Sequence, residues 1–292
     1  MQKYFWLIVL VSIALGFLWP APALPLKPYL QHLLMLIMFF TCLKMDVNEL
    51  KKIPQDAFKY AAVLILVFII PSIIIFLFKD SLNREIFIGL LLSSAVPAGI
   101  SVVFMSDILG GHPVKALVST TLSHLISPIL TPLIVWIFAR QIIHIDFLTM
   151  AGIIAKLIFI PFVLAQIIRR FKVRDFLIQK SMIFNIILTA ILIWGIIAPT
   201  QGLISGSWNQ IAAAAGVVFL NLIIKIILSS FLASEKREAI TWIIVSFYKN
   251  STMASVIALS MFGPVVLLGT VVEMVVNNIM LIPIQLLSRK IR

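Results

Sequence analysis

The sequence predicts an all-α membrane protein with ten transmembrane helices, arranged as two inverted five-helix repeats whose broken helices 4 and 9 cross. Of the 292 residues, 62% are hydrophobic and only 12% are charged, and the mean hydropathy is +1.14. A soluble domain carries about 25% charged residues. Apolar stretches of about 20 residues, long enough to span a bilayer, follow one another along nearly the whole chain. Two of them are interrupted at corresponding places in the two halves. These observations exclude a soluble enzyme.

Ten apolar segments follow in order, separated by short connectors that are rich in proline, glycine or basic residues. Several prolines follow the first segment, a Lys51-Lys52 pair precedes the third, and Gly110-Gly111 separates the fourth from the fifth. We interpret residues 1–292 as a single integral membrane unit without a soluble domain. The segments lie near residues 4–20, 27–45, 57–78, 84–111, 114–139, 147–169, 176–198, 207–234, 238–263 and 265–288.

The first segment resembles a signal peptide. Lys3 precedes an apolar run, and Ala21-Pro22-Ala23 resembles a small-residue cleavage site. We nevertheless expect this helix to be retained, because the arrangement of five plus five helices requires it.

Charge predicts the orientation in the membrane. The formal net charge is +12 and the pI is near 10.0, which in a soluble protein would suggest a nucleic-acid partner. Here 16 of the 23 Lys and Arg residues fall on the side that holds both termini, and four fall on the other side. Basic residues are enriched in cytoplasmic loops. We therefore expect both termini to be cytoplasmic, in the cytoplasmic (inner) membrane, with lipid and no nucleic acid as a partner.

An odd number of helices in each repeat forces the second repeat to run upside down, and in such transporters the binding site lies where corresponding helices are interrupted. The fourth segment is interrupted at Pro97-Ala98-Gly99, and the ninth has a polar centre that includes Ser246, Lys249, Asn250 and Ser251. Interrupted helices expose unpaired carbonyls and amides, which attract cations and anionic groups respectively. The two breaks therefore predict a binding site for a small ion and an organic anion.

Charged residues inside apolar segments are costly and need an explanation. Lys249 lies 11 and 14 residues from the ends of its segment, too deep to reach water easily, and Glu273 in the tenth segment is its expected partner. The alternative is a structural lysine bonded to freed carbonyls. We expect Lys225 to extend toward the membrane surface, Asp107 to be solvated or paired with Lys115, and Lys156 to have no role.

The fifth segment carries a run of hydroxyl residues. Thr120 and His124 share a helix face at i, i+4 spacing. Hydroxyls in membrane helices often bond only to their own helix or to a neighbour, so structural and binding roles are both open. For His124, a hydrogen-bonded interhelical histidine is favoured over a proton carrier.

Motifs for enzymatic chemistry are absent from the sequence. The single cysteine, Cys42, excludes an internal disulfide and a multi-cysteine metal site. There is no paired-carboxylate motif, no His/Cys/Asp cluster and no Gly-rich phosphate loop. We expect no enzymatic activity, no metal and no cofactor.

Several motifs together resemble the bile acid:sodium symporter (BASS) family. They include the run 34–45, Val96-Pro97-Ala98-Gly99, the run 120–132 and Lys249-Asn250-Ser251 with the later Phe262-Gly263-Pro264. The resemblance implies ten helices and two domains. A panel domain would hold helices 1, 2, 6 and 7 (about 4–45 and 147–198), and a core domain helices 3–5 and 8–10 (about 57–139 and 207–288). It also implies transport of organic anions, in many members with sodium.

The chain departs from this family at the positions that hold sodium. Where sodium-coupled members carry oxygen-bearing side chains, and glutamine before the asparagine of the ninth helix, this chain has apolar residues and Lys249. Side chains of valine, alanine and leucine supply no oxygen ligand for sodium. Both sodium sites are therefore expected to be lost, with the Lys249 ammonium in place of a bound cation. The apolar replacements are Leu66, Val102, Val103, Ala116 and Val245.

We expect a secondary active transporter that carries a small organic anion by alternating access without classical sodium coupling. Proton coupling, exchange and uniport stay open, with the proton as the candidate ion and sodium disfavoured. The alternatives are a sodium-coupled symporter with backbone-built ion sites, and a transporter-like receptor that binds without flux. The candidate substrate- and ion-binding residues are Pro97, Gly99, Thr120, His124, Ser246, Lys249, Asn250, Ser251 and Glu273.

Overall fold

A computed structural model describes residues 5–43, 56–204 and 206–291, and within these ranges the chain is helical and forms no β-strand. The expected segment ends at residues 4 and 44–45, and the basic residues Lys44, Lys51 and Lys52, lie outside the described residues. Within the part of the chain that the structure describes, seven helices are long and apolar enough to cross a membrane, and Leu7–Leu18 and Ser251–Met261 are shorter apolar helices. The chain is therefore an integral membrane protein, as the sequence predicts.

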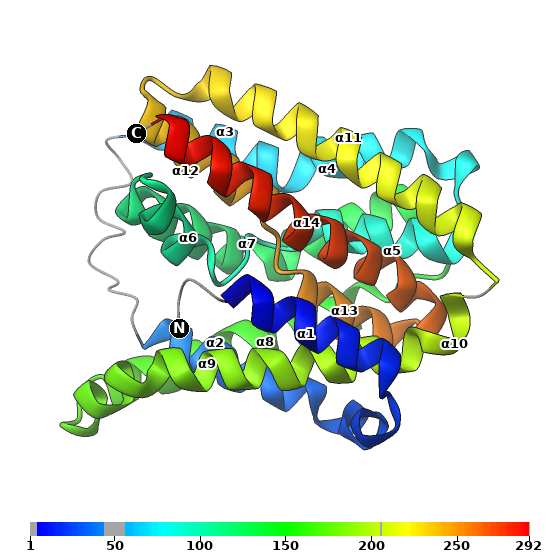
Figure 1. The fold of residues 1–292 in the computed structure, drawn as a ribbon, viewed down its shortest axis with the longest axis horizontal. Coiled ribbons are helices and arrows are strands. Elements are labelled where there is room, and N and C mark those ends of the chain that lie inside the picture. The colour runs from blue at the N-terminus through cyan, green and yellow to red at the C-terminus, as the bar shows by residue number, and fades with distance from the viewer. Residues whose placement is uncertain (1–4, 44–55, 205, 292) are drawn as a thin grey trace.

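One group of helices lies along one side of the molecule, at the bottom of Figure 1. In this group α9 contacts α1 and α2, and α2 also contacts α8. A 3₁₀ segment, η2 (Ala21–Tyr29), joins α1 to α2. The members are α1 (Phe5–Leu18), α2 (Leu30–Cys42), α8 (Phe147–Ile168) and α9 (Val173–Ile197).

A second group lies above the first and contains the two interrupted segments (Figure 1). Its closest contact is between α5 and α14, and α11 packs against both α12 and α14. The members are α3 (Ala57–Leu64), η4 (Ile65–Ile69), α4 (Ile70–Leu77), α5 (Arg84–Ala95), α6 (Val102–Leu109), α7 (Pro113–Ala139), α11 (Trp208–Leu232), α12 (Lys236–Phe247), α13 (Ser251–Met261) and α14 (Pro264–Ile291). The short connectors are η5 (Lys79–Ser81), η6 (Ala198–Thr200) and α10 (Gln201–Ile204).

α1 begins and α14 ends at the same end of the molecule (Figure 1). The expectation that this end is cytoplasmic stays a prediction. At this end, the buried carboxylate of Glu238 accepts hydrogen bonds from Lys59 (2.8 and 2.9 Å) and from Lys115 (2.6 Å). Lys115 also pairs with Asp56 at 3.0 Å. Of the two alternatives expected for Asp107, the solvated one is found: Asp107 is exposed, and Lys115 pairs with Glu238 and Asp56 instead.

Asp146 explains why α8 begins where it does. Its carboxylate accepts hydrogen bonds from the Thr149 amide (3.0 Å) and the Thr149 hydroxyl (2.6 Å). This is an N-cap, which satisfies an amide that has no partner within the helix. The two hydrogen bonds lower the pKa of the Asp146 carboxyl, because they favour its charged form.

A proline changes the helix that α3, η4 and α4 form together. Pro71 has no backbone N–H, so the carbonyl of Val67, four residues earlier, cannot receive the usual helical hydrogen bond. Residues Ile65–Ile69 form a π-helical turn at this place, and such turns frequently lie at functional sites. The Ser72 hydroxyl donates to the Phe68 carbonyl at 2.7 Å. The Val67 carbonyl remains open to a donor from elsewhere in the fold.

Two glycines allow α5 and α14 to pack closely. A Cβ atom at Gly269 would approach the Ile86 carbonyl oxygen and lie 2.9 Å from the Leu90 nitrogen, and one at Gly89 would meet Val266 and Gly269. The obstacles are backbone atoms of the facing helix, which cannot move aside cheaply. Small residues commonly permit such approaches between membrane helices.

We predict that Gly269→Ala destabilises the protein by about 1–3 kcal/mol, the usual cost of overpacking. The free energy of unfolding of the purified protein in detergent would measure this. Gly216→Ala in α11 is the matched control, because a Cβ there has no atom within 4 Å. Equal stabilities of the two variants would contradict the proposed role of the α5–α14 contact.

Candidate functional site

The two interrupted helices meet at their breaks. α5 ends at Ala95 and α6 begins at Val102, while α12 ends at Phe247 and α13 begins at Ser251. The two extended stretches form an antiparallel bridge between Ala98 and Lys249. The Gly99 amide donates to the Tyr248 carbonyl (2.7 Å), and the Asn250 amide donates to the Pro97 carbonyl (2.9 Å). Each break thus supplies a hydrogen-bond partner to a backbone group of the other, which lipid cannot supply.

Helix α7 satisfies two more backbone groups at this crossing. The Thr131 hydroxyl donates to the Ala95 carbonyl at the end of α5 (2.7 Å), and the Ser123 hydroxyl accepts from the Ala98 amide (3.3 Å). Ser123 also donates to the Thr120 carbonyl (2.7 Å). The hydroxyl run of α7 therefore has a structural role at Ser123 and Thr131.

The Lys249 ammonium reaches from the crossing into the second group of helices. It donates a hydrogen bond to the Val67 carbonyl, the carbonyl that Pro71 leaves without a helical donor. It also lies 5.1 Å from the centre of the Phe68 ring, within the range of a cation–π contact. Only 3% of the residue is exposed. The alternative in the sequence analysis was a bond to carbonyls freed at the breaks, whereas the acceptor found here is a carbonyl of η4.

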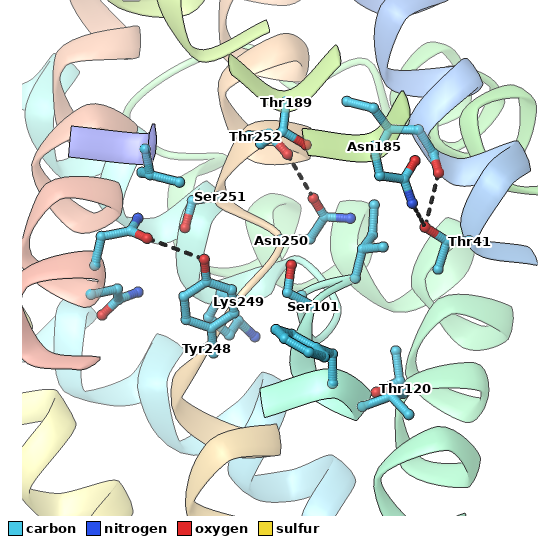
Figure 2. Close-up of a pocket in the computed structure, with 18 of the residues that line it drawn as sticks. Thr41, Ser101, Thr120, Asn185, Thr189, Tyr248, Lys249, Asn250, Ser251 and Thr252 are labelled. Atoms are coloured by element: carbon cyan, nitrogen blue, oxygen red, sulfur yellow. Dashed lines mark hydrogen bonds between the residues drawn. The ribbon is translucent and has the colours of Figure 1, made fainter. Parts of the chain in front are cut away.

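A cavity of about 480 Å³ lies beside the crossing, between the two groups of helices. Figure 2 shows Tyr248, Lys249 and Asn250 on one side of it, and Thr41 and Asn185 on another. Pockets for small ligands usually measure about 300–1,000 Å³, so this volume suits a small organic molecule. Apolar parts of its wall come from Ile37, Ile100, Phe104, Ile186 and Ile193.

The first group of helices contributes polar side chains that the sequence analysis missed. Asn185 and Thr189 of α9 and Thr41 of α2 line the cavity, and the Asn185 amide donates to the Thr41 hydroxyl at 3.2 Å (Figure 2). On the opposite wall, the Tyr248 hydroxyl donates to Asn278 at 3.1 Å. These residues are uncharged and isolated in apolar segments. An inspection of amide side chains in apolar segments, and not only of charged ones, would have found them.

The cavity contacts five of the nine predicted site residues: Gly99, Thr120, Lys249, Asn250 and Ser251. Asn250 also caps α13, since its side-chain oxygen accepts from the Met253 amide (3.2 Å) and the Thr252 hydroxyl (3.0 Å). The Thr120 hydroxyl is buried in the wall and has no hydrogen-bond partner among the described residues.

The other four predicted residues do not line this cavity. Pro97 contributes its carbonyl to the crossing. His124 lies at a separate, smaller cavity of about 30 Å³, and its Nδ1 bonds to the Thr120 carbonyl of its own helix (2.8 Å). The interhelical bond expected for His124 is therefore not found among the residues that the structure describes. The Ser246 hydroxyl bonds to Ser229 of α11 (2.9 Å).

The fourth of these residues, Glu273, is buried in α14, and its predicted ion pair with Lys249 is wrong. The Lys249 ammonium bonds to Val67 instead, and it interacts with the Glu273 carboxylate only at longer range. The expectation that Lys225 extends to the membrane surface is also wrong. Lys225 is 2% exposed and interacts electrostatically with Glu273. The polar face of α11 points inward, where it meets α12 and α14.

Apolar helices, two crossed breaks and a cavity between two helix groups are the features expected of a membrane transporter. Residues 31–206 match the Sodium Bile acid symporter family. The chain belongs to this family. Its members are transporters and not enzymes, and the resemblance in the sequence is confirmed.

A relative in Bacillus subtilis (strain 168) is named as the uncharacterized sodium-dependent transporter YocS. It is 22% identical to this chain over 213 residues, which are 72% of this chain and 65% of the relative. The matched region therefore spans just under two thirds of the relative's length.

We predict that Gly99→Ala loosens the crossing, because a Cβ at this position would lie 2.7 Å from the Tyr248 ring and 3.0 Å from the Tyr248 carbonyl oxygen. Backbone amides near residues 97–100 and 248–251 should exchange with deuterium about tenfold faster, which corresponds to about 1.4 kcal/mol. Mass spectrometry of the corresponding peptides would measure this. Gly152→Ala in α8, where a Cβ has open space, should leave exchange unchanged. Unchanged exchange in Gly99→Ala would contradict the prediction.

Proposed function

We propose that the chain is a secondary active transporter that moves a small organic anion by alternating access, without sodium as a stoichiometric co-substrate. The observation that carries this proposal is the position of Lys249. A buried ammonium lies at the crossing of two interrupted helices, beside a cavity of suitable size. Membership of a transporter family supports transport over enzymatic activity.

We also propose ten spans in two inverted repeats, with α5–α6 and α12–α13 as the fourth and ninth. The group of α1, α2, α8 and α9 would be the panel domain, and the second group the core domain. The cavity between the groups supports this division, because movement of one domain against the other would open it to either side in turn. We place both termini on the cytoplasmic side of the cytoplasmic membrane.

The anionic group of the substrate would bind at the crossing. The N-terminus of α13 directs backbone amides and a partial positive charge toward the cavity at Ser251 and Thr252. The free Thr120 hydroxyl and the Asn185 amide lie on the surrounding walls. The exposed carboxylate of Asp107 also borders the cavity and would disfavour an anion near it. The apolar side chains of the cavity would hold the organic part of the substrate.

The Lys249 ammonium would act as a fixed cation. Its residue lies two positions after the end of α12, and its acceptor is the otherwise open carbonyl of Val67 in η4. Apolar side chains surround this region. Leu66, Val102, Ala116 and Val245 are buried and offer no oxygen ligand. A tethered charge would thus replace a mobile one.

The second candidate is a sodium-coupled symporter whose ions bind backbone carbonyls and the hydroxyl and amide groups near the crossing. The names of the family and of the relative favour it, since the family name includes sodium and YocS is named as sodium-dependent. The two candidates differ in ion dependence. A receptor with the same fold would bind an anion without moving it.

We predict that replacing sodium by choline leaves anion affinity nearly unchanged, because the proposed site contains its own cation. A panel of organic anions that begins with taurocholate would be screened by thermal shift of the purified protein. Uptake of the anion with the largest shift would then be measured in proteoliposomes. Affinity that collapses in choline and returns with sodium along a saturable curve would establish the second candidate. Binding without uptake would establish a receptor.

We predict that Lys249→Ala and Lys249→Gln weaken anion binding by about 1–3 kcal/mol, the value of a charge-assisted hydrogen bond. Isothermal titration in sodium and in choline would measure this. Only Lys249→Gln should gain a slight response to sodium, since an amide oxygen can ligate a cation and a methyl group cannot. Lys156→Ala in α8 is the control, because Lys156 is exposed and away from the cavity. Normal binding and transport by Lys249→Ala would contradict the fixed-cation mechanism.

A further inference from the structure

Three charged side chains lie together in the second group of helices, next to the crossing. Lys225 comes from α11, Glu273 from α14, and Lys249 from the stretch between α12 and α13. Their exposed fractions are 2%, 3% and 3%. Each interacts electrostatically with at least one of the others, and no further charged group takes part among the described residues. We call these three residues the charge cluster.

The neighbours of the charge cluster are polar but uncharged. Ser93 of α5 and Asn277 of α14 lie next to the Glu273 carboxylate. Asn221 and Ser229 lie four residues before and after Lys225, on the same face of α11, and Ser229 bonds to Ser246 of α12. Among the described residues, no other charged group interacts with the cluster to compensate its net charge.

The hydrogen bonds distinguish the two lysines. Lys249 has an acceptor in the Val67 carbonyl and a ring beneath its ammonium. Lys225 has neither a hydrogen bond nor an ion pair among the described residues. The Oε2 atom of Glu273 is also unpartnered. When all three side chains are ionised, the cluster carries one positive charge that no anion matches, and burial of unmatched charge is costly.

The charge cluster borders the cavity through Lys249 and through α14. Lys249 itself lines the cavity. Asn277 and Met274 of α14 also line it, and they lie four residues and one residue after Glu273. A change of charge in the cluster therefore changes the electrostatic energy of an anion in the cavity, because interactions between charges are weakly screened in a buried region.

We propose that Lys225, Glu273 and Lys249 form a proton-exchange site, and that the exchanged proton is the coupling ion of this transporter. This inference rests on the proposed function. The proton resides on Lys225 in the charged state, in which the cluster is +1. Release of this proton to water leaves neutral Lys225 beside an ionised Glu273 and Lys249.

The charge balance sets the direction of coupling. A monovalent anion in the cavity neutralises the +1 state of the cluster, whereas it leaves the neutral state with a net charge of −1. Anion and proton therefore favour each other's binding, and by linkage each raises the affinity of the other by the same factor. The loaded transporter moves a proton and an anion together without net charge.

A ligand-free experiment tests the proton site by itself. Proton uptake on unfolding of the purified full chain at pH 9 would be followed with an indicator dye. Unfolded lysine is protonated there, since its ordinary pKa is about 10.4. Wild type should take up one proton more than Lys225→Met, because the folded cluster has released it. Lys156→Met, which removes an exposed lysine, should match wild type.

A second variant keeps this test decisive if Lys225→Met folds poorly. Glu273→Gln removes the only negative charge of the cluster, so two ammonium groups face each other. The folded variant should then release its proton at least one pH unit lower than wild type. Equal proton uptake by wild type and Lys225→Met, or an unchanged release in Glu273→Gln, would overturn the proposal.

The coupling is tested with taurocholate, whose sulfonate stays ionised throughout, or with the anion that the screen identifies. Wild-type affinity should fall up to tenfold per pH unit over the range of proton release. Lys225→Met should bind weakly and independently of pH. Lys225→Met/Glu273→Gln retains Lys249 as the single charge, so it should bind more tightly than Lys225→Met and also independently of pH. A wild-type pH slope that persists in Lys225→Met would overturn the coupling. If no anion binds, the proposed function fails, whereas the ligand-free result still decides the proton site.

Discussion

The structure depends on one constraint, which is that a backbone interrupted inside a membrane must find partners for its amides and carbonyls within the protein. The two breaks meet this constraint mainly by crossing, since each supplies a donor to the other. Hydroxyls of α7 complete the arrangement at Ala95 and Ala98. A cavity beside such a crossing is surrounded by helix ends, whose partial charges are fixed by the fold. The crossing that supplies partners to the interrupted backbone thus also creates the surroundings in which a ligand can bind.

The same constraint explains the place of Lys249. Pro71 removes an N–H from the neighbouring helix, and the Val67 carbonyl that loses its donor receives the ammonium instead. The carbonyl that the proline leaves open in one helix thus accepts a hydrogen bond from the ammonium of a residue in a break. Neither would be stable alone at this depth, because an open carbonyl and an unpaired ammonium are both expensive to bury. Together they hold η4 against the crossing.

Local chemistry made part of this structure predictable. Pro97 and Gly99 exclude a regular helix, and the polar run around Asn250 marks a second break, so both interruptions could be placed from sequence. The acceptor of Lys249 could not, because it lies about 180 residues away in the chain and depends on how α3–α4 packs. The inward position of Lys225 was missed for a similar reason. Depth along a helix can be counted from sequence, but the direction of a helix face is decided by its neighbours.

Attachment of the cation to the chain has a thermodynamic consequence under the proposed function. A dissociable ion enters at the concentration of one compartment and leaves at that of the other, so its gradient performs work on the substrate. The Lys249 ammonium has no concentration and no gradient. It can fill an electronegative pocket in every conformation, but it cannot drive accumulation. The work of concentrating a substrate must then come from a species that is exchanged with the surrounding water, or transport must end at equilibrium.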